Sequence, residues 1–502
     1  MSPAGARLKQ AWRGLPVPWS WRLRFKSALF RLFAPLLRHT NAFRRWESQR
    51  GHPPFARAQS AALRPRAAVP RAVPLAPAPV DPAALHAKLI AFYLPQFHPI
   101  PENDAWWGRG FTEWTNVSKA LPQFDGHEQP QLPGELGFYD LRLPEVMQRQ
   151  VELARHYGVH AFCFHYYWFE GRRVLERPLD MFAADPSLDL PFCICWANEN
   201  WTRRWDGHDH DVLLGQTHTP ESDLRFIRDV EPLLRNPRYL RVGGRPLLIV
   251  YRPSLLPDIA ATTERWREHC RGSGLGEILL GMVQFDAEDP RPLGFDLAIE
   301  FPPHKLARDL PCINDALPGL NPEFRGYAIQ YQAVVDVAKQ WPEPDFDLVR
   351  GVFPGWDNEA RKPQQGYLFA NRSPEAYRDW LRFAVDYALR RPVAGEPLVF
   401  VNAWNEWAEG AFLEPDRRNG YAYLQATRDA LTGEVAKLAR DATPRIVVVS
   451  HDAHPHGAQY LSLHLCQQLA RASGRKVDVV LLGGGVLEPE FEQVATVHRL
   501  RG

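Results

Sequence analysis

The feature that most constrains the fold of this chain is a repeated alternation between short apolar runs of strand length and longer amphipathic stretches of helical length. Eight apolar runs follow Lys88: Leu89–Pro95, His160–Tyr167, Phe192–Ala197, Pro246–Tyr251, Ile278–Phe285, Asp296–Phe301, Leu348–Phe353 and Leu398–Ala403. Five amphipathic stretches lie among them: Pro144–Tyr157, Ser222–Leu234, Leu256–Arg271, Tyr327–Lys339 and Pro374–Leu389. Apolar strands that alternate with helices indicate a parallel sheet buried on both faces. The pattern predicts an α/β fold, a (β/α)₈ TIM-like barrel, with a doubly wound open sheet as the alternative.

Composition divides the chain into four expected parts: a basic amphipathic segment at residues 1–50, a linker rich in Pro and Ala at 51–87, the barrel at 88–440 and a C-terminal piece at 441–502. The basic part stands apart because Met1 to Val80 holds fifteen Lys or Arg against one acid, Glu47, although the whole chain carries a net charge of only +2. The Pro-rich stretch favours extended polyproline conformations and cannot pack a core.

The C-terminal piece starts a new α/β pattern. Arg445 to Ser450 is expected to form a buried strand, Ala458 to Ala472 a helix, and Val477 to Leu482 a second strand. This order opens a Rossmann-like fold. About 60 residues are too few to complete a nucleotide-binding domain, so we expect a partial segment without independent activity.

Residues 19–46 interleave aromatic and basic side chains and leave two interpretations open. They form either a basic amphipathic helix that lies on an anionic membrane surface or a helix that docks on a neighbouring domain. Met1 to Trp12 lacks the apolar stretch of a secretory signal, and no window reaches the roughly 18 apolar residues of a membrane-spanning helix. We therefore expect a cytoplasmic protein, held at the inner face of the membrane if residues 19–46 bind lipid.

Polar and aromatic side chains gather where the predicted strands end. In a barrel these ends converge on one pocket, and flat aromatic faces beside carboxylates and amides suit a sugar, whose apolar C–H side stacks while its hydroxyls form hydrogen bonds. The alternative is that these aromatic side chains only cap the core. The strand-end residues expected to bind substrate are His98, His165, Tyr166, Tyr167, Trp168, Trp196, Asn198, Glu199, Asn200, Trp201, Tyr251, Trp356, Asp357, Trp404, Asn405 and Trp407.

Glu406 and Glu409 are the expected catalytic pair. If the chain forms a helical turn after the last strand, positions i and i+3 lie on one side and both carboxyl groups reach the same substrate. Two such groups in a partly dry pocket titrate apart, which leaves one ionised and one protonated for base and acid chemistry. The alternative is a helix N-terminus that attracts acids.

We expect no metal, no cofactor and no nucleic acid. His98, His127, His165, His208, His210 and His304 show no closely spaced ligand set. Gly483-Gly484-Gly485 lacks the spacing of a phosphate-binding loop, and the basic N-terminal part has no recognisable nucleic-acid motif. The six cysteines show no disulfide framework, which favours a reducing compartment.

Six ordered motifs resemble the WbsX-like group of bacterial proteins, which is similar to glycoside hydrolase family 99, the endo-acting α-mannosidases and mannanases. The motifs are Phe92 to His98, Gly110 to Val117, Gly126 to Pro130, Phe164 to Trp168, Trp196 to Trp201 and Asn405 to Gly410, within a match from about Lys88 to Leu438. The resemblance implies a (β/α)₈ barrel and retaining chemistry on an α-mannoside-like bond without a metal. It also brings Glu113 and Trp114 to the substrate.

The resemblance implies a role for each glutamate. Glu406 corresponds to a base that acts on the sugar 2-hydroxyl to give a 1,2-anhydro intermediate, and Glu409 to the general acid and then base, which is one of the exceptions to direct carboxylate attack. WbsX-like proteins accompany surface-polysaccharide and O-antigen assembly. The C-terminal piece resembles the start of a family 4 glycosyltransferase lobe, cut short. Ala408 departs from the polar residue common in family 99.

Three functions follow as hypotheses. The first is a glycoside hydrolase or transglycosylase that acts on an oligosaccharide or polysaccharide. The second is a glycosyltransferase of lipopolysaccharide assembly, against which counts the absence of a nucleotide-binding pattern between Lys88 and Leu438. The third is a noncatalytic glycan-binding module, which would bind sugar whether or not Glu406 and Glu409 are neutralised.

Overall fold

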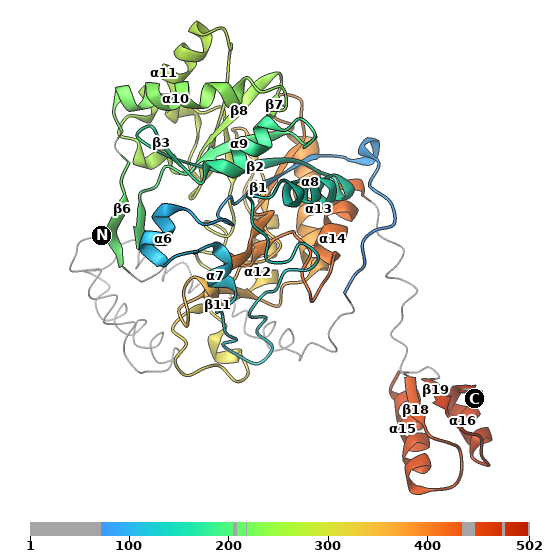
Figure 1. Ribbon diagram of the computed structural model, residues 1–502. Coiled ribbons are helices and arrows are strands. Elements are labelled where there is room, and N and C mark those ends of the chain that lie inside the picture. Colours follow the sequence, from blue (N-terminus) through green and yellow to red (C-terminus); the bar gives the residue numbers. More distant parts are fainter. Residues whose placement is uncertain (1–71, 204–207, 217, 434–446, 474–476, 500–502) are drawn as a thin grey trace, which may run out of the picture. The chain divides into compact units, whose positions relative to one another are not determined.

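The computed structural model describes residues 72–499 except for 204–207, 217, 434–446 and 474–476. The chain divides into two compact units, Met1–Glu434 and Val435–Gly502 (Figure 1). The expected basic segment, with residues 19–46, and the first part of the expected linker lie outside the described residues. Within the described part of the chain, no helix combines the length and the apolarity that crossing a membrane requires.

The first unit is built on a parallel barrel sheet. Its strands are β1 (Lys88–Tyr93), β2 (Val159–Phe169), β4 (Phe192–Trp196), β8 (Arg245–Val250), β9 (Leu279–Gln284), β10 (Leu297–Glu300), β12 (Leu348–Val349), β13 (Gly351–Val352) and β15 (Leu398–Val401). Their hydrogen-bonded order is β12-β10-β9-β8-β4-β2-β1-β15-β13, and every neighbouring pair on this path is parallel. All eight predicted strands are therefore present.

The barrel closes through a single interrupted strand. Only Arg350 separates β12, which pairs with β10, from β13, which pairs with β15. Residues 348–352, here called the closing strand, thus join the two ends of the sheet. Gly351 lies so close to β10 that an added Cβ would stand 2.1 Å from the carbonyl oxygen of Glu300, so the approach of the two strands needs a glycine there.

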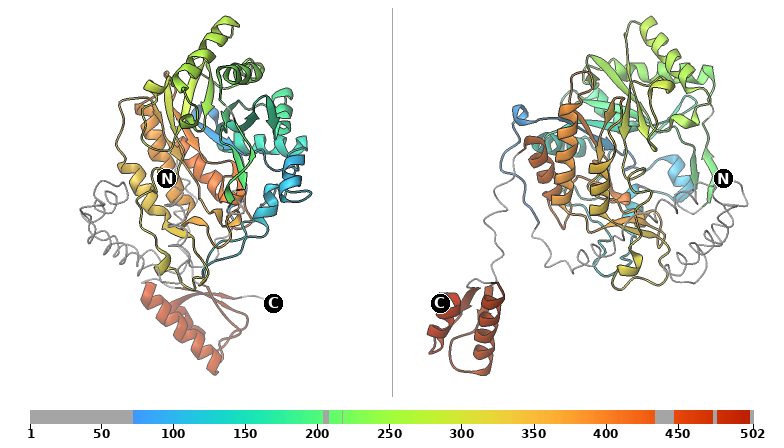
Figure 2. Two further views of the ribbon diagram at one scale, coloured as in Figure 1. Left: turned by 90° about the vertical axis from the view of Figure 1, so that its left-hand side faces the viewer. Right: turned by 180° about the vertical axis from the view of Figure 1, so that it is seen from behind.

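Helices cover the outside of the barrel and connect successive strands (Figures 1 and 2). They are α8 (Pro144–Tyr157), α9 (Glu176–Ala184), α10 (Pro220–Leu234), α11 (Ile259–Gly272), α12 (Tyr331–Gln340), α13 (Pro374–Arg390) and α14 (Ala422–Thr432). Between β9 and β10 the connection holds only the short turn η5 (Arg291–Leu293). Strand, helix and strand in this order confirm the predicted (β/α)₈ class.

Smaller elements decorate the connections. They are η2 (Pro82–Ala84), α6 (Pro101–Trp107), α7 (Glu113–Val117), β3 (Arg172–Val174), β5 (Trp201–Arg203), β6 (His208–Leu214), β7 (Arg241–Val242), η4 (Pro253–Leu255), η6 (Asn314–Ala316), β11 (Tyr327–Gln330), η7 (Asn358–Ala360), β14 (Tyr367–Ala370), β16 (Asn405–Glu406), η8 (Trp407–Glu409) and β17 (Ala411–Phe412).

One predicted helix begins too early. The expected helix Tyr327–Lys339 starts only at Tyr331, because Tyr327 to Gln330 form strand β11, which pairs with β14 in parallel. Ala328 and Ile329 are buried. Burial of this short apolar run against a distant strand outweighs its fit to the helical pattern that follows.

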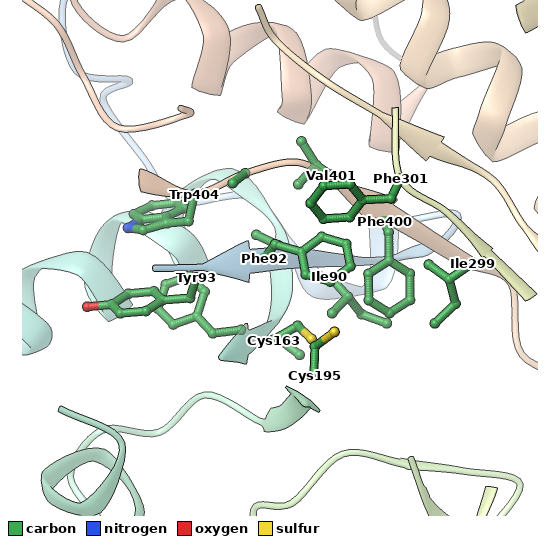
Figure 3. Close-up of a cluster of buried hydrophobic side chains, with 14 of the residues drawn as sticks. Ile90, Phe92, Tyr93, Cys163, Cys195, Ile299, Phe301, Phe400, Val401 and Trp404 are labelled. Carbon is green, nitrogen blue, oxygen red and sulfur yellow. The ribbon is translucent and has the colours of Figure 1, made fainter. Parts of the chain in front are cut away.

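The barrel interior is rich in aromatic and sulfur-bearing side chains (Figure 3). Phe92 of β1 contacts Phe301 edge to face, with ring centroids 4.8 Å apart, and Phe400 at 5.2 Å. Cys163 and Cys195, on neighbouring strands, are fully buried beneath them. This packed layer forms the floor on which a cavity at the C-terminal ends of the strands can rest.

The described end of the expected linker packs against the barrel. The backbone N–H of Ala76 donates to Tyr157 Oη at 2.9 Å, and that of Val80 donates to the carbonyl of His156 at 2.9 Å. Arg428 of α14 donates to the carbonyl of Ala78 at 2.6 Å. Residues 72–87, here called the strap, are therefore bound to α8 and α14.

The second unit has its own small core. A parallel sheet of β18 (Val447–Ser450), β19 (Val477–Leu481) and β20 (Ala495–Arg499) packs with α15 (Gly457–Ser473) and α16 (Glu488–Val494). Val479, Leu481 and Phe491 are buried in it. The predicted strand, helix and strand are present, and β20 adds a third strand.

Candidate active site

One cavity of the barrel unit, here called the reaction cavity, has a volume of about 400 Å³. Its walls come from the C-terminal part of β2, from residues just past the ends of β1, β4, β8, β10, the closing strand and β15, and from α6 and β6. Parallel strands converge at this end of a barrel. Residues far apart in the chain therefore meet in one place.

Nine of the residues expected to act on substrate line this cavity: His165, Tyr167, Glu199, Asn200, Trp201, Tyr251, Trp356, Glu406 and Glu409. The strand period explains part of this selection. His165 and Tyr167 alternate along β2 with Tyr166 and Trp168, so only the first pair points inward.

Four of the predicted aromatic residues lie instead in the layer between strands and helices: Tyr166, Trp168, Trp196 and Trp404. Trp168 Nε1 donates to Asp229 at 2.6 Å, and the ring of Trp196 stacks on Phe226 with centroids 4.1 Å apart. Trp404 packs on Phe162 at 5.0 Å. Their position on the outer face of the strands corresponds to the core-capping alternative.

The remaining predicted residues also do not line the cavity: His98, Glu113, Trp114, Asn198, Asp357, Asn405 and Trp407. They fix the loops around it. Asn198 accepts from the backbone N–H of Arg252 at 2.7 Å and donates to its carbonyl at 2.8 Å. Asn405 likewise makes two hydrogen bonds with the backbone of Leu94. It accepts from the Leu94 N–H at 2.8 Å and donates to the Leu94 carbonyl at 3.0 Å, which ties β16 to the end of β1.

His98 and Trp114 bond only to backbone carbonyls. His98 Nδ1 lies 3.1 Å from the carbonyl oxygen of Pro95, and Trp114 Nε1 donates to the carbonyl of Tyr139 at 2.8 Å. Both side chains are buried. They shape the loop between β1 and α8.

Glu406 and Glu409 sit on one tight turn. Glu406 ends β16 and precedes the single 3₁₀ turn η8, in which residues i and i+3 are nearly eclipsed. Gly410 follows with φ of +64°, and an added Cβ would stand 2.9 Å from Asp357 N. Asp357 N in turn donates to the carbonyl of Glu409 at 2.5 Å. The turn is thus locked against η7, and both carboxyl groups reach the cavity.

One arginine holds both carboxyl groups. Arg361, just after η7, places NH2 2.6 Å from Glu406 Oε1 and NH1 2.6 Å from Glu409 Oε1. Its Nε donates to Glu113 Oε1 at 2.7 Å. The four residues Glu113, Arg361, Glu406 and Glu409 are called the shared-arginine cluster below. One guanidinium charge cannot neutralise three carboxylates, so at least one glutamate of the cluster tends to bind a proton.

Burial sets the protonation of this cluster. It raises the pKa of Glu409 to about 7, although Arg361 acts in the opposite direction and Glu406 adds to the rise. Burial also raises the pKa of Glu406 and of Glu113, again against the effect of Arg361. Glu409 is therefore close to half protonated at neutral pH, the condition that suits a group which donates and later accepts a proton.

A buried polar network supports the turn from behind. Glu414 accepts from Trp407 Nε1 at 2.6 Å, from Gln150 Nε2 at 2.6 Å and from Tyr139 Oη at 3.0 Å. Burial raises the pKa of Glu414 to about 7. Trp407, which was expected at the substrate, thus anchors η8 to the core.

Sequence reasoning missed several residues of the cavity. Besides Arg361 they include Lys362, Asn103, Trp106, Trp107 and His304. Burial lowers the pKa of His165 and of His304 to about 4, so both rings are neutral near pH 7. Trp106 and Trp107 end α6, and their adjacent indoles in a Pro-initiated helix were the signal that could have found them. Among the described residues, no three His, Cys, Asp or Glu side chains are grouped to hold a metal.

A known protein family matches this chain. The model of the family described as "Glycosyltransferase WbsX" matches residues 89–427. This range begins inside β1 and ends within α14, so it spans the barrel strands, η7 and η8.

Curated relatives match over the same unit. Two proteins described as "Uncharacterized protein WxcX", from two strains of Xanthomonas campestris pv. campestris, are 53% identical over 371 residues, which is 74% of this chain. The match covers 53% of each relative, so the chain spans about half the length of the curated relatives it matches.

Solved structures resemble the chain at low identity. A GH99 endo-alpha-mannosidase from Bacteroides thetaiotaomicron is 14% identical with a TM-score of 0.42, covering 69% of this chain and 96% of that one. A glycoside hydrolase-like protein is 14% identical with a TM-score of 0.46, covering 73% and 98%.

Proposed function

Because the chain belongs to the WbsX family of carbohydrate-active enzymes, we propose that it cleaves an α-mannoside-like bond in a bacterial surface polysaccharide and retains the anomeric configuration. The observation that carries this proposal is the shared-arginine cluster. Two carboxyl groups on one turn face a cavity of about 400 Å³, and burial brings the pKa of one of them to about 7.

The proposed chemistry assigns one role to each glutamate. Glu406 takes the proton of the sugar 2-hydroxyl while that oxygen attacks C1, and Glu409 gives its proton to the departing glycosidic oxygen. In the second half Glu409 takes a proton from water as the water oxygen attacks C1. The C1–O2 bond breaks, and Glu406 returns its proton to O2. Arg361 contacts both carboxyl groups, so it favours the ionised form of whichever has lost its proton.

The rest of the cavity suits a sugar chain. Trp106, Trp201 and Tyr251 offer flat faces to the apolar side of a pyranose, and Glu199 and Asn200 offer oxygen and nitrogen atoms to its hydroxyls. Trp106 and Trp201 pack edge to face with centroids 5.7 Å apart, so their faces are fixed before substrate arrives.

The experiment is to incubate the protein with surface polysaccharide from the bacterium that produces it and to follow new reducing ends by mass spectrometry. Glu409→Gln and Glu406→Gln should each remove cleavage while thermal unfolding stays as in the wild type. Glu145→Gln, at an exposed position of α8, is the matched control and should keep full activity. Full turnover in both active-site variants would refute the proposal.

Glycosyl transfer is the second candidate function, favoured by the description of the family as a glycosyltransferase. The same 1,2-anhydro intermediate reacts with a sugar hydroxyl in place of water if an acceptor fills the cavity. Product that forms only when a nucleotide sugar is added would support transfer from an activated donor. Reducing ends that form without any nucleotide sugar would support hydrolysis.

A further inference from the structure

A second hollow adjoins the reaction cavity. It has a volume of about 120 Å³, and Trp356 lines both spaces. Its walls come from the loop 124–131 that precedes α8, from residues 317–318, and from the segment 356–372 that contains η7 and β14. Two features singled out in the sequence converge here and not in the reaction cavity: Asp357 and the segment Gly126 to Pro130.

The apolar part of the second hollow consists of fixed ring faces. The ring of Phe124 stacks on that of His127 with centroids 4.5 Å apart and planes 5° from parallel. Phe369 and Trp356 add two further rings from the opposite segment. Rings held in this way can cover the C–H face of a sugar at little entropic cost.

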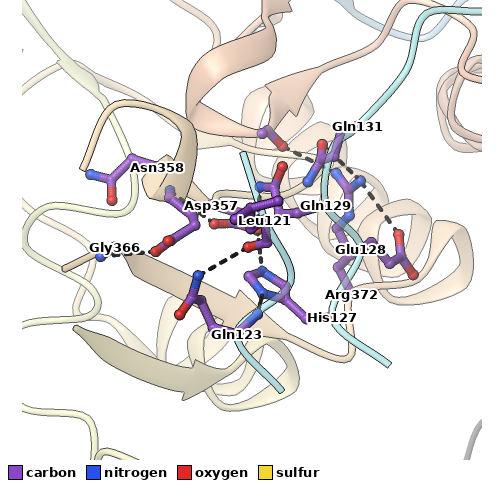
Figure 4. Close-up of polar contacts among 12 residues, drawn as sticks. Leu121, Gln123, His127, Glu128, Gln129, Gln131, Asp357, Asn358, Gly366 and Arg372 are labelled. Carbon is purple, nitrogen blue, oxygen red and sulfur yellow. Dashed lines mark hydrogen bonds and ion pairs between the residues drawn. The ribbon is translucent and has the colours of Figure 1, made fainter. Parts of the chain in front are cut away.

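The polar part is an ordered network (Figure 4). Asp357 Oδ2 lies 2.7 Å from His127 Nε2 and accepts from Gln129 Nε2 at 2.8 Å. Arg372 donates to the carbonyl of Gly410 at 3.1 Å and to Gln131 Oε1 at 3.2 Å, and Glu128 lies 3.7 Å from it. The positive charge of Arg372 is thus compensated by Glu128 and by two oxygen acceptors of the protein.

The exposed polar groups of the second hollow select for a neutral ligand. Asp125 and Asn371 are both exposed and lie at its lining, and Glu128 is partly exposed. Carboxylate and amide oxygens accept hydrogen bonds from sugar hydroxyls. The Asp125 carboxylate repels phosphate, sulfate or uronate groups, which disfavours an acidic sugar.

Two hydrogen bonds, one from a backbone N–H and one from a side chain, connect the second hollow to the catalytic turn. Asp357 donates through its N–H to the carbonyl of Glu409, and Arg372 donates to the carbonyl of Gly410. A ligand bound in the second hollow would contact Asp357 and Arg372, and these two residues hold the end of η8 in place. Occupation of the hollow can therefore steady the turn that carries Glu406 and Glu409.

We propose that the second hollow is a subsite for one neutral sugar unit that adjoins the unit processed in the reaction cavity, either next in the glycan chain or as a branch on it. This inference rests on the proposed function. The volume corresponds to on the order of four water molecules, which fits part of one sugar unit and not a longer chain. Trp356 lies between the two units.

The test compares ligand lengths in a binding experiment. All proteins carry Glu409→Gln to prevent turnover, and calorimetry measures binding of α-mannobiose and α-mannotetraose. The test variant adds Asp125→Ala and Asn371→Gly, since Gly tolerates the φ of +60° at residue 371. The matched control adds Asp315→Ala, an exposed acid outside both cavities.

The expected result is binding of the tetrasaccharide about tenfold weaker in the test variant, as for the loss of one or two hydrogen bonds, with disaccharide binding unchanged. The control should match the parent for both ligands. Equal binding of the tetrasaccharide by test and parent proteins would overturn the subsite and leave the proposed function standing. Failure of the parent to bind either mannoside would overturn both.

Discussion

At the scale of single residues, the charge of Arg361 decides how the candidate active site titrates. The guanidinium contacts three carboxyl groups, and the side chains of Glu113, Glu406 and Glu409 are 0%, 8% and 19% exposed. Water can therefore screen Glu409 most and Glu113 not at all. The protonation of Glu409 therefore depends on how the one positive charge of Arg361 is shared among the three carboxyl groups.

The first prediction concerns pH. Glu409 must be protonated to act as an acid, and burial raises its pKa to about 7. Activity should therefore be present below pH 7 and fall as pH rises through it, by about tenfold per unit at high pH. A profile of kcat/KM between pH 5 and 9 measures this limb. A rate that stays level up to pH 9 would contradict the assignment of Glu409 as the acid.

The second prediction is that Glu113→Gln moves this limb. The variant keeps an acceptor for Arg361 Nε but removes one negative charge, so the guanidinium acts more strongly on Glu406 and Glu409 and lowers their pKa. The high-pH limb should shift to lower pH by about one unit. Glu145→Gln, far from the cluster, should leave it in place. An unchanged limb would mean that Glu113 is already neutral in the free enzyme.

The sequence predicted the two catalytic candidates but not their counter-ion. Glu406 and Glu409 form a spaced pair at a strand end, which is a recognisable pattern. Arg361 is a single arginine in a loop, 45 positions from Glu406, and no local pattern marks it. Its role follows only from the fold, which packs η7 against η8.

At the scale of elements, two short 3₁₀ turns, η7 and η8, define the geometry of the site. Asp357 caps η7 by accepting from Glu359 N at 3.1 Å, and the same residue bonds to the carbonyl of Glu409 through its backbone. Gly410 allows this contact because it has no Cβ. The spacing of Glu406 and Glu409 therefore depends on two turns from separate parts of the chain.

The third prediction is that Gly410→Ala separates these turns. The new Cβ would meet Asp357 N at 2.9 Å and Asp357 Cβ at 3.0 Å, in a conformation that L-residues rarely adopt. We expect a loss of about 1 to 3 kcal/mol in stability and a fall in kcat of at least tenfold, since the two glutamates move. Denaturant unfolding and steady-state kinetics measure both. Gly395→Ala, also at positive φ but with open space around it, is the matched control and should lose stability only.

The strands were more predictable than the residues between them. Each barrel strand is a compact apolar run, which the alternation with helices makes visible. The aromatic residues after β2 and β4 were less predictable, because alternate residues of a strand point to opposite faces. Without the register, Tyr166 and Trp168 look the same as His165 and Tyr167, although only the second pair faces the cavity.

At the scale of the whole molecule, the strap extends the barrel unit in the N-terminal direction. Composition predicts a linker there, and in the structure Ala76 and Val80 are buried and five hydrogen bonds tie the strap to α8 and α14, at His156, Tyr157, Arg428 and Leu431. Pro-rich composition does not reveal whether a surface of the folded unit accepts such a segment, and part of the strap forms the 3₁₀ turn η2.

The fourth prediction compares two truncations. A chain that begins at Ala72 should unfold at the same temperature as the full chain, whereas one that begins at Lys88 loses the strap and should unfold on the order of 5 °C lower. Differential scanning calorimetry measures the difference. Equal unfolding temperatures for the two truncations would show that the strap adds nothing to stability.

The closing strand has a consequence for the behaviour of the molecule in acid. Glu300 binds Arg350 at 2.9 Å and Lys305 at 3.0 Å, and although burial acts against them these two cations hold the pKa of Glu300 below its ordinary value. Its contribution is present above that ordinary value and vanishes as pH drops through the depressed one. Loss of these ion pairs would let β10 separate from the closing strand and open the barrel. The exposed strand edge would then present unpaired backbone groups to another copy of the chain. Acid should therefore make this protein aggregate. A barrel that closes without such ion pairs should lose stability in acid without exposing a strand edge in this way.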